Sequence, residues 1–251
     1  MVSFLKKAAL NIIFFTLLLV FTLACLLVLT IPMILIRLMA GNRATQKWLR
    51  HIILWYGYVV VRCFTFPFVR IEYKDYEEGK KIGPCVYVSN HRSFSDGFLM
   101  AHLNVEGIQV VNIWPFRIPV LGLMARLAGY LSVNAMSFEE FSKKACEFLK
   151  QGVSIGAFPE GSRSGSKTLK SFHGAVFRVA LMARCPIVPV CITGNENIPP
   201  RGSCLLNPGT VKMHKLPALK WEDYQTLTPF NLKNKVRDII QQEIETMEAV
   251  C

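Results

Sequence analysis

Apolar positions divide the chain into two parts near residue 70. From Ala8 to Ile36 there is no charged side chain. As one helix this stretch would be about 43 Å long, against about 30 Å for the hydrocarbon core of a bilayer. A second apolar stretch, Trp48 to Val69, mixes aromatic with aliphatic side chains. We therefore expect residues 1–70 to form a membrane-embedded or interfacial helical segment and residues 71–251 to form a separate α/β domain.

Two membrane topologies fit the first part of the chain. Pro32 would interrupt a helical ladder, which leaves a shorter segment able to turn within one leaflet. Cations flank the first apolar stretch on both sides: Lys6 and Lys7 before it; Arg37, Arg43, Lys47 and Arg50 after it. Cations at both ends favour a hairpin with both ends at the anionic cytoplasmic leaflet. A single transmembrane span remains the alternative.

After residue 70, short apolar runs alternate with longer amphipathic ones, which is the pattern of an α/β sheet covered by helices. The runs predict strands at Cys85–Ser89, Ile108–Ile113, Tyr130–Val133, Val153–Phe158 and Ile187–Thr193. They predict helices at Gly97–Leu103, Val120–Ala128, Phe138–Gln151, Gly174–Arg184 and Leu232–Met247, the third opened by a capping box of Ser137 and Glu140. Residues 195–220 are rich in Pro and Gly and are expected to be irregular.

The formal net charge of +12 is concentrated in the first part of the chain. Residues 1–70 hold eight Lys or Arg and no Asp or Glu. Because the basic excess lies beside lipid-type sequence, and no zinc or helix-turn-helix spacing occurs, we expect a membrane surface as the partner and no nucleic acid. The eight cysteines form no C-x-x-C pair, which favours free thiols, no metal site and a catalytic part on the cytoplasmic face.

A histidine and an aspartate lie five positions apart in SNHRSFSDG, directly after the predicted strand that ends at Ser89. On a straight strand His91 and Asp96 would be about 16 Å apart, but a loop that curls brings them together. A carboxylate on one imidazole nitrogen fixes the tautomer of a general base. The alternative is that Asp96 only caps the following helix. No G-x-S-x-G nucleophile occurs, so the substrate would bring its own hydroxyl.

A second polar sequence, FPEGSRSGS at residues 158–166, follows another predicted strand. Its backbone N–H groups and the guanidinium of Arg163, oriented by Glu160, would suit a phosphate or carboxylate. A solvated turn is the plainer interpretation. A third alternative is a nucleotide site, because residues 161–168 nearly match a P-loop, although Ser166 replaces the required glycine.

Four ordered blocks together resemble the glycerolipid acyltransferase family, most closely its 1-acylglycerol-3-phosphate acyltransferases. The blocks are NHRSFSD at 90–96, IPVLG at 118–122, FPEGSRS at 158–164 and VPV at 188–190. The resemblance implies a mixed sheet of the glycerol-3-phosphate acyltransferase type, behind an N-terminal membrane-embedded helical segment.

The resemblance also implies a reaction. His91, held by Asp96, would remove the proton from the free hydroxyl of a lysolipid, which attacks the thioester of acyl-CoA or acyl carrier protein. Glu160, Gly161, Ser162 and Arg163 would bind the acceptor. No cofactor or metal is implied beyond the acyl donor, and the partners are membrane lipids.

Some positions depart from the family pattern, and they concern the acceptor. Relatives that use a phosphate acceptor commonly have a lysine where this chain has Ile113 and Asp-Arg where it has Asn134 and Ala135. His173 stands where relatives often have lysine. Cations that could compensate are Arg117, Arg126, Lys167 and Lys170. Another lysophospholipid or a lyso-aminolipid is therefore an alternative acceptor, and a lipid-binding protein without turnover is an alternative function.

Overall fold

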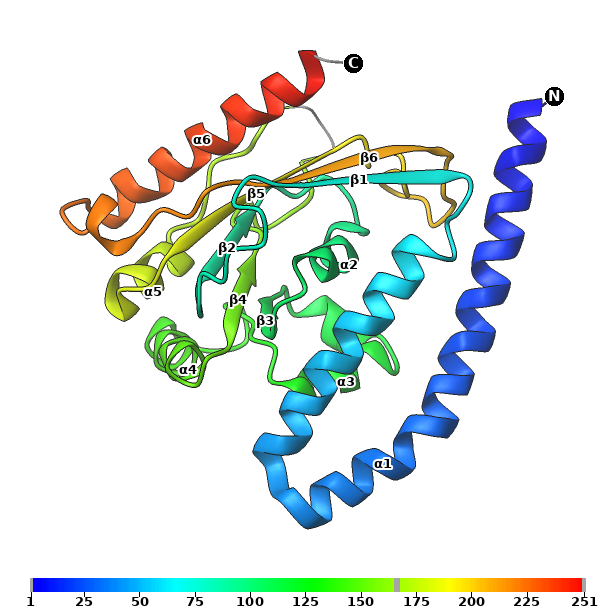
Figure 1. Cartoon of the computed structure of the whole chain (residues 1–251), viewed down its shortest axis with the longest axis horizontal. Helices are drawn as coiled ribbons and strands as arrows, with labels where there is room; N and C mark the ends of the chain where they lie inside the picture. The colour runs from blue at the N-terminus through cyan, green and yellow to red at the C-terminus, as the bar shows by residue number, and fades with distance from the viewer. Residues whose placement is uncertain (1, 165–167, 250–251) are drawn as a thin grey trace.

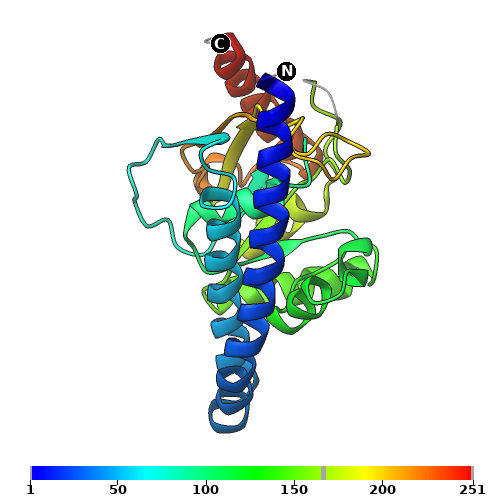
Figure 2. The same ribbon diagram turned by 90° about the vertical axis from the view of Figure 1, so that its right-hand side faces the viewer.

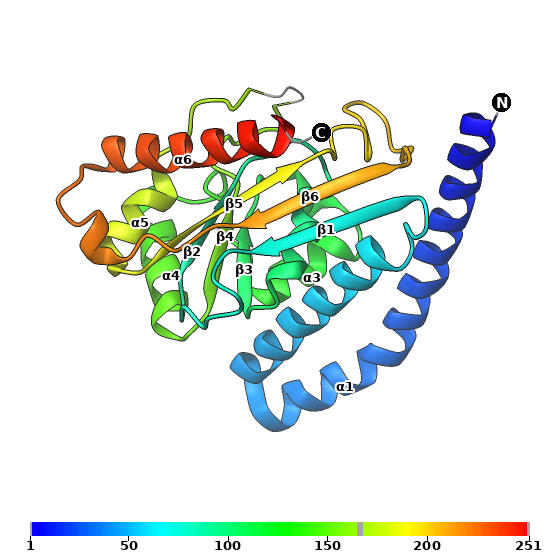
Figure 3. The ribbon, with the colours of Figure 1, turned by 45° about the horizontal axis from the view of Figure 1, so that its top comes forward.

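The computed structural model describes residues 2–164 and 168–249 and contains one six-stranded sheet (Figures 1 and 3). The strand order is β1-β6-β5-β2-β4-β3. The strands are β1 (Val69–Asp75), β2 (Val86–Ser89), β3 (Gly107–Val110), β4 (Ser154–Ala157), β5 (Ile187–Thr193) and β6 (Gly209–Lys215). Only β5 and β6 pair antiparallel, so the sheet is mixed, as the family resemblance implied.

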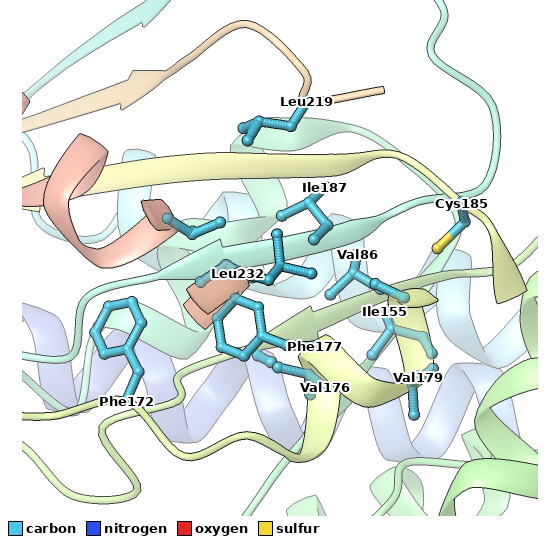
Figure 4. Close-up of a cluster of buried hydrophobic side chains, with 14 of the residues drawn as sticks. Val86, Ile155, Phe172, Val176, Phe177, Val179, Cys185, Ile187, Leu219 and Leu232 are labelled. Atoms are coloured by element: carbon cyan, nitrogen blue, oxygen red, sulfur yellow. The ribbon is translucent and has the colours of Figure 1, made fainter. Parts of the chain in front are cut away.

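Helices cover both faces of the sheet, and each face has its own hydrophobic core. Val86 and Val88 of β2 point to one core, and Tyr87 between them points to the other, because side chains alternate along a strand. The first core is closed by α4 (Phe138–Lys150), α5 (Ala175–Ala183) and α6 (Pro229–Ala249) (Figure 4). The second core packs against α1 (Val2–Arg62), α2 (Asp96–Leu99) and η1 (Met100–Leu103). Three shorter helical elements complete the fold: η2 (Trp114–Arg117), α3 (Leu121–Ala128) and η3 (Trp221–Asp223).

Helix α1 is a bent pair of helices, which we call arm 1 (residues 2–40) and arm 2 (residues 42–62). The turn lies at Gly41, whose φ of 76° is easy for glycine and costly for other residues. Pro32 lies inside arm 1 and does not end it, so the prediction of a break at Pro32 was wrong in position. A proline removes one helical hydrogen bond and bends its helix, whereas the change of direction here lies at a glycine, which reaches a positive φ without strain.

Side chains hold the two arms together and tie arm 1 to the rest of the chain. The hydroxyls of Thr22 and Tyr56 are 2.7 Å apart, and the ring of Phe21 stacks on that of Tyr56. Near the start of arm 1, the Asn11 amide donates to the carbonyl of Leu206 and accepts from its N–H, each at 2.8 Å. This buried pair anchors the apolar arm on the loop before β6.

Most predicted elements are present with shifted ends, but some expectations were wrong and some elements were missed. Residues 130–133 do not form a strand; Leu131 makes a single bridge to Val110. Residues 209–215, expected to be irregular, form β6, and β1 was not predicted. At the start of α4, Ser137 caps the N–H of Glu140 as predicted, but the Glu140 carboxylate accepts from Lys144 instead of completing the capping box.

Candidate active site

Three neighbouring strands bring the site together, because the carboxyl ends of parallel strands lie at the same edge of a sheet. Strand β2 lies between β5 and β4 and runs parallel to both. The chain leaves β2 at Ser89, β4 at Ala157 and β5 at Thr193. The segments that follow, 90–96, 158–164 and 194–199, therefore meet at one place.

His91 and Asp96 are in direct contact, as the sequence predicted. The distance from Nδ1 of His91 to Oδ2 of Asp96 is 2.7 Å. The Asp96 side chain is fully buried, whereas that of His91 is 23% exposed. Within the described residues, Nε2 of His91 has no protein hydrogen-bond partner. A carboxylate therefore holds one ring nitrogen and leaves the other available to a substrate, which is the arrangement of a general base.

The hydrogen bonds of Asp96 do not fit the alternative that this residue only caps the helix that follows it. Oδ2 of Asp96 accepts from the backbone N–H of Arg92 at 2.7 Å and from that of Ser93 at 2.9 Å, both of which precede it in the chain. These bonds curl the loop back on itself, which is what places His91 over the carboxylate. The second oxygen, Oδ1, accepts from the side-chain amide of Asn195 after β5.

Asn90 and Ser93 fix the loop to the neighbouring segment. The Asn90 side chain donates to the carbonyl of Ile192 and accepts from its N–H, each at 2.8 Å, in the way that an added strand residue would. The Ser93 hydroxyl donates to the carbonyl of Ile198 at 3.0 Å. Both side chains are buried, so the loop is held rigidly on each side of the histidine.

The loop after β4 surrounds the backbone of His91. Glu160 Oε1 accepts from the His91 N–H at 2.8 Å, and Oε2 accepts from the Lys170 N–H at 3.1 Å. The Ser164 N–H donates to the His91 carbonyl at 2.8 Å. Burial raises the pKa of Glu160, and the two N–H donors oppose that shift. Both oxygens of Glu160 therefore bind backbone, and within the described residues Glu160 forms no hydrogen bond or ion pair with the Arg163 guanidinium.

Gly161, Ser162 and Arg163 lie at the surface of the same loop. Gly161 has a φ of 68°, and a Cβ there would come within 3.0 Å of the His173 ring. The Lys170 ammonium bridges the Ser162 hydroxyl and the Arg163 carbonyl, at 2.9 and 3.0 Å. These three predicted binding residues thus lie on the loop that contacts the backbone of His91. Residues 165–167, which include Lys167 and the middle of the P-loop-like sequence 161–168, lie outside the described residues.

Arg92 is directed away from solvent although it follows the partly exposed His91. Its side chain is 1% exposed and forms ion pairs with Glu196, after β5, and with Glu248, in the last turn of α6. Burying a cation is costly unless carboxylates balance it, so these contacts explain how an arginine fits at this position.

The positions that depart from the family pattern are mostly exposed. Asn134 donates to the Asn112 side chain at 3.2 Å, and Ile113 is exposed beside it. Arg117 is exposed, and Arg126 donates to the carbonyl of Phe116 at 2.9 Å.

Sequence reasoning missed three residues that act on the pair. Asn195 holds Asp96, Ser164 holds the His91 backbone, and the Phe158 ring packs on the His91 ring with centroids 4.7 Å apart. The rule about strand ends could have found Asn195, since it follows β5 just as His91 follows β2. The sequence holds no signal for which loop atoms meet.

Comparisons with known proteins agree with the geometry. The family model described as acyltransferase matches residues 70–193. The 1-acyl-sn-glycerol-3-phosphate acyltransferase BAT2, chloroplastic, of Brassica napus is 35% identical over 134 residues, which are 52% of this chain and 39% of that protein. The 1-acyl-sn-glycerol-3-phosphate acyltransferase of Salmonella typhimurium is 25% identical over 201 residues, covering 77% of this chain and 80% of that protein.

The fold as a whole also has a known counterpart. The crystal structure of the 1-acyl-sn-glycerophosphate acyltransferase PlsC from Thermotoga maritima has a TM-score of 0.77 and covers 98% of both chains at 22% identity. At that identity the likeness concerns the fold. The chain spans only 39% and 43% of the two chloroplastic relatives from Brassica napus and Arabidopsis thaliana.

The matched family model spans β2, β4 and β5, the strands whose carboxyl ends lie beside His91 and Asp96, so this part of the chain is an acyltransferase domain. The chain belongs to the acyltransferase family, among the proteins that resemble 1-acyl-sn-glycerol-3-phosphate acyltransferases.

Proposed function

We propose that the protein transfers a fatty acyl group from the thioester of acyl-CoA or acyl carrier protein to the free hydroxyl of a lysolipid. The observation that carries this proposal is the contact of His91 with the buried Asp96 carboxylate. His91 Nε2 takes the hydroxyl proton while the oxygen attacks the thioester carbonyl, and the thiolate leaves. Since the acceptor supplies the nucleophile, no acyl-enzyme forms. We also propose that the reaction needs no cofactor or metal ion besides the acyl donor.

The acceptor we propose first is 1-acylglycerol-3-phosphate, because relatives of this chain carry that name. Arg163 lies on the loop that holds His91, and its guanidinium has no ion-pair partner within residues 2–164 and 168–249. A guanidinium fork suits a phosphate. Another lysophospholipid or a lyso-aminolipid is the alternative acceptor, favoured by the uncharged side chains of Ile113 and Asn134.

A panel of acceptors tests the proposed function. Membranes that contain the protein are given radiolabelled acyl-CoA or acyl carrier protein with lysophosphatidic acid, lysophosphatidylcholine or a lyso-aminolipid. We expect labelled phosphatidic acid to form fastest. Turnover of another acceptor alone would support the alternative acceptor. No turnover with any acceptor and either donor would favour a lipid-binding protein and refute the acyltransferase proposal.

Glu160 is proposed to position His91 rather than to touch the acceptor. Both of its oxygens already accept from backbone N–H groups, and a carboxylate beside an anionic phosphate would be repulsive. In Glu160→Gln an amide N–H₂ group replaces one carboxylate oxygen, so it faces the backbone N–H of His91 or of Lys170, and two donors oppose each other. We expect kcat to fall about tenfold, less than the full contribution of a general base, because the base is displaced and not removed, while KM for the acceptor changes little.

Steady-state kinetics with the acceptor varied measures this split, and Glu147→Gln, an exposed change on α4, is the matched control. An unchanged kcat with a raised KM would instead assign Glu160 to acceptor binding.

Membrane association is indicated by α1, the one helix of the described residues that is long and apolar enough to cross a bilayer, and the uncharged run Ala8–Ile36 lies in its arm 1. We propose that arm 1 lies along one leaflet instead of crossing it. Asn11 ties its beginning to Leu206, and just past the bend Arg50 donates to the carbonyl of Ala128 and to Glu106, both at 3.0 Å. If arm 1 crossed the bilayer at right angles, the charged region around Arg50 and Glu106 would be drawn into the hydrocarbon core. Along a leaflet, residues such as Leu27, which is 79% exposed, enter the lipid.

The catalytic part is proposed to face the cytoplasm, as its free cysteines favour. The names of two relatives include the word chloroplastic, so the stroma is the alternative compartment on the same reasoning.

A further inference from the structure

A second stretch of the chain, between Glu106 and Glu139, shares the charge pattern of the first 70 residues. It contains no Asp or Glu, and its charged side chains are Arg117 and Arg126. The stretch includes η2 and α3. The charged side chains that this stretch contributes are therefore cations alone, and cations are complementary to an anionic lipid leaflet.

Large apolar side chains are exposed on η2 and α3. Trp114 is 46% exposed and Leu123 is 54% exposed. Ile113 and Leu127 are also exposed, and the Arg126 guanidinium lies 5.8 Å from the centroid of the Phe116 ring. We call the exposed side chains of Ile113, Trp114, Arg117, Leu123, Arg126 and Leu127 the η2–α3 face. Trp beside Arg on an apolar surface is the composition found at the headgroup boundary of a membrane.

The η2–α3 face adjoins the membrane-associated helix pair. Helix α3 packs against α1, and Arg50 of arm 2 donates to the carbonyl of Ala128 at the end of α3. Figure 2 views the molecule from the side of arm 1, and the green helices of this region stand to one side of the blue arm and are not covered by it. A leaflet that receives arm 1 therefore lies next to this face.

The face also touches the catalytic loop. The ring of Trp114 packs against the ring of Phe94, with centroids 5.8 Å apart. Phe94 lies in the loop between His91 and Asp96. If Trp114 lies at the headgroup boundary of a membrane, it therefore links that boundary directly to the loop that carries His91.

We propose that the η2–α3 face is a second membrane contact, which binds an anionic phospholipid leaflet beside arm 1. Trp114 and Leu123 enter the boundary between headgroups and acyl chains, and Arg117 pairs with lipid phosphates. The contact presents lipid acceptors to the catalytic loop through Trp114 and Phe94. This last step rests on the proposed acyltransferase function, whereas the membrane contact itself does not.

Quenching of tryptophan fluorescence by brominated phospholipids tests the contact on the full-length protein. Vesicles contain phosphatidylglycerol and phosphatidylcholine brominated near the start of the acyl chains. The signal of Trp114, obtained as the difference between wild type and Trp114→Phe, is expected to be quenched. The matched difference for Trp221, which lies in η3 beside Tyr224, is expected to remain unquenched. A Trp114 signal that vesicles leave unchanged would overturn the proposal.

Activity on two forms of the acceptor tests the consequence for catalysis. Leu123→Glu and Arg117→Gln change exposed side chains and should fold. Acylation of a vesicle-bound lysolipid should fall about fivefold in Arg117→Gln, the factor for one basic residue near an anionic surface, and further in Leu123→Glu. Acylation of a short-chain, water-soluble lysolipid should be unchanged in Leu123→Glu, whose side chain is no candidate for acceptor binding. The controls Lys143→Gln and Met182→Glu, exposed on α4 and α5, should leave both activities unchanged.

The outcomes separate this proposal from the proposed function. Loss of activity on both acceptor forms alike in Leu123→Glu would refute the membrane contact but not the acyltransferase. If Arg117→Gln slowed turnover only with acyl carrier protein as the donor, with Trp114 unquenched, a protein partner would cover this face and the lipid assignment would be wrong. Quenching of Trp114 without acyl transfer to any acceptor would support the contact and refute the proposed function.

Discussion

The His91→Ala variant is expected to lose thioester-dependent acyl transfer by at least about 1000-fold, within the range that a positioned general base contributes. In the structure the imidazole is the group whose second nitrogen is held by a buried carboxylate. Without it, the acceptor hydroxyl must attack while still protonated. The initial rate of labelled diacyl product measures the loss.

The fold should survive this change, because the His91 side chain is partly exposed and its backbone contacts to Glu160 and Ser164 do not need the ring. Circular dichroism and thermal unfolding check that point. His51→Ala, which removes an exposed histidine of arm 2, is the matched control and should keep full activity. Turnover of His91→Ala at the rate of the control would remove the proposed base.

The Asp96→Asn variant is expected to lower kcat by about 10⁴-fold, by analogy with the loss of the orienting acid in a catalytic triad. An amide in place of the carboxylate no longer stabilises the imidazolium and no longer selects the tautomer that leaves Nε2 free. Here the environment adds a further cost. Oδ2 accepts from His91 and two backbone N–H groups, and Oδ1 accepts from Asn195, so either orientation of an amide places its N–H₂ against donors.

Because of those buried donors, Asp96→Asn is also expected to lower the free energy of unfolding by about 1–3 kcal/mol. The double variant Asp96→Asn with Asn195→Asp returns an acceptor to the neighbouring position and should recover stability but not activity. That difference separates folding from catalysis. A single variant with kcat within tenfold of wild type would show that the carboxylate does not orient the base.

Among the strands, those predicted most closely are the ones whose side chains are buried on both faces. Strand β5, Ile187–Thr193, was predicted at its observed bounds because all of its residues are apolar enough to read as a continuous run. Strands β1 and β6 escaped because they alternate: Val211 and Met213 are buried, while Thr210 is exposed and His214 lies at intermediate depth. They pair with each other at one side of the sheet, where polar residues are tolerated.

Sequence reasoning found the site contact between residues that are close in the chain and missed the contacts between residues that are far apart in it. His91 and Asp96 are close in sequence, so a curled loop was enough to bring them together. Asn195 lies 99 positions beyond Asp96, and only the pairing of β2 with β5 places it there. Glu160 was expected to orient Arg163, its near neighbour in the chain, yet its oxygens bind the backbone of His91 and Lys170. These contacts depend on which strands pair in the sheet. A short sequence pattern does not reveal that pairing.

The central claim is that a hydroxyl of the acceptor attacks the thioester directly, with His91 as the base. The most direct measurement is thiol release from radiolabelled acyl-CoA by the purified protein in vesicles, with and without lysophosphatidic acid, followed by a search for label on the protein. We expect thiol release only with the acceptor present, in step with formation of phosphatidic acid, and no labelled protein. Labelled protein formed without acceptor, or equal thiol release by His91→Ala, would contradict the account.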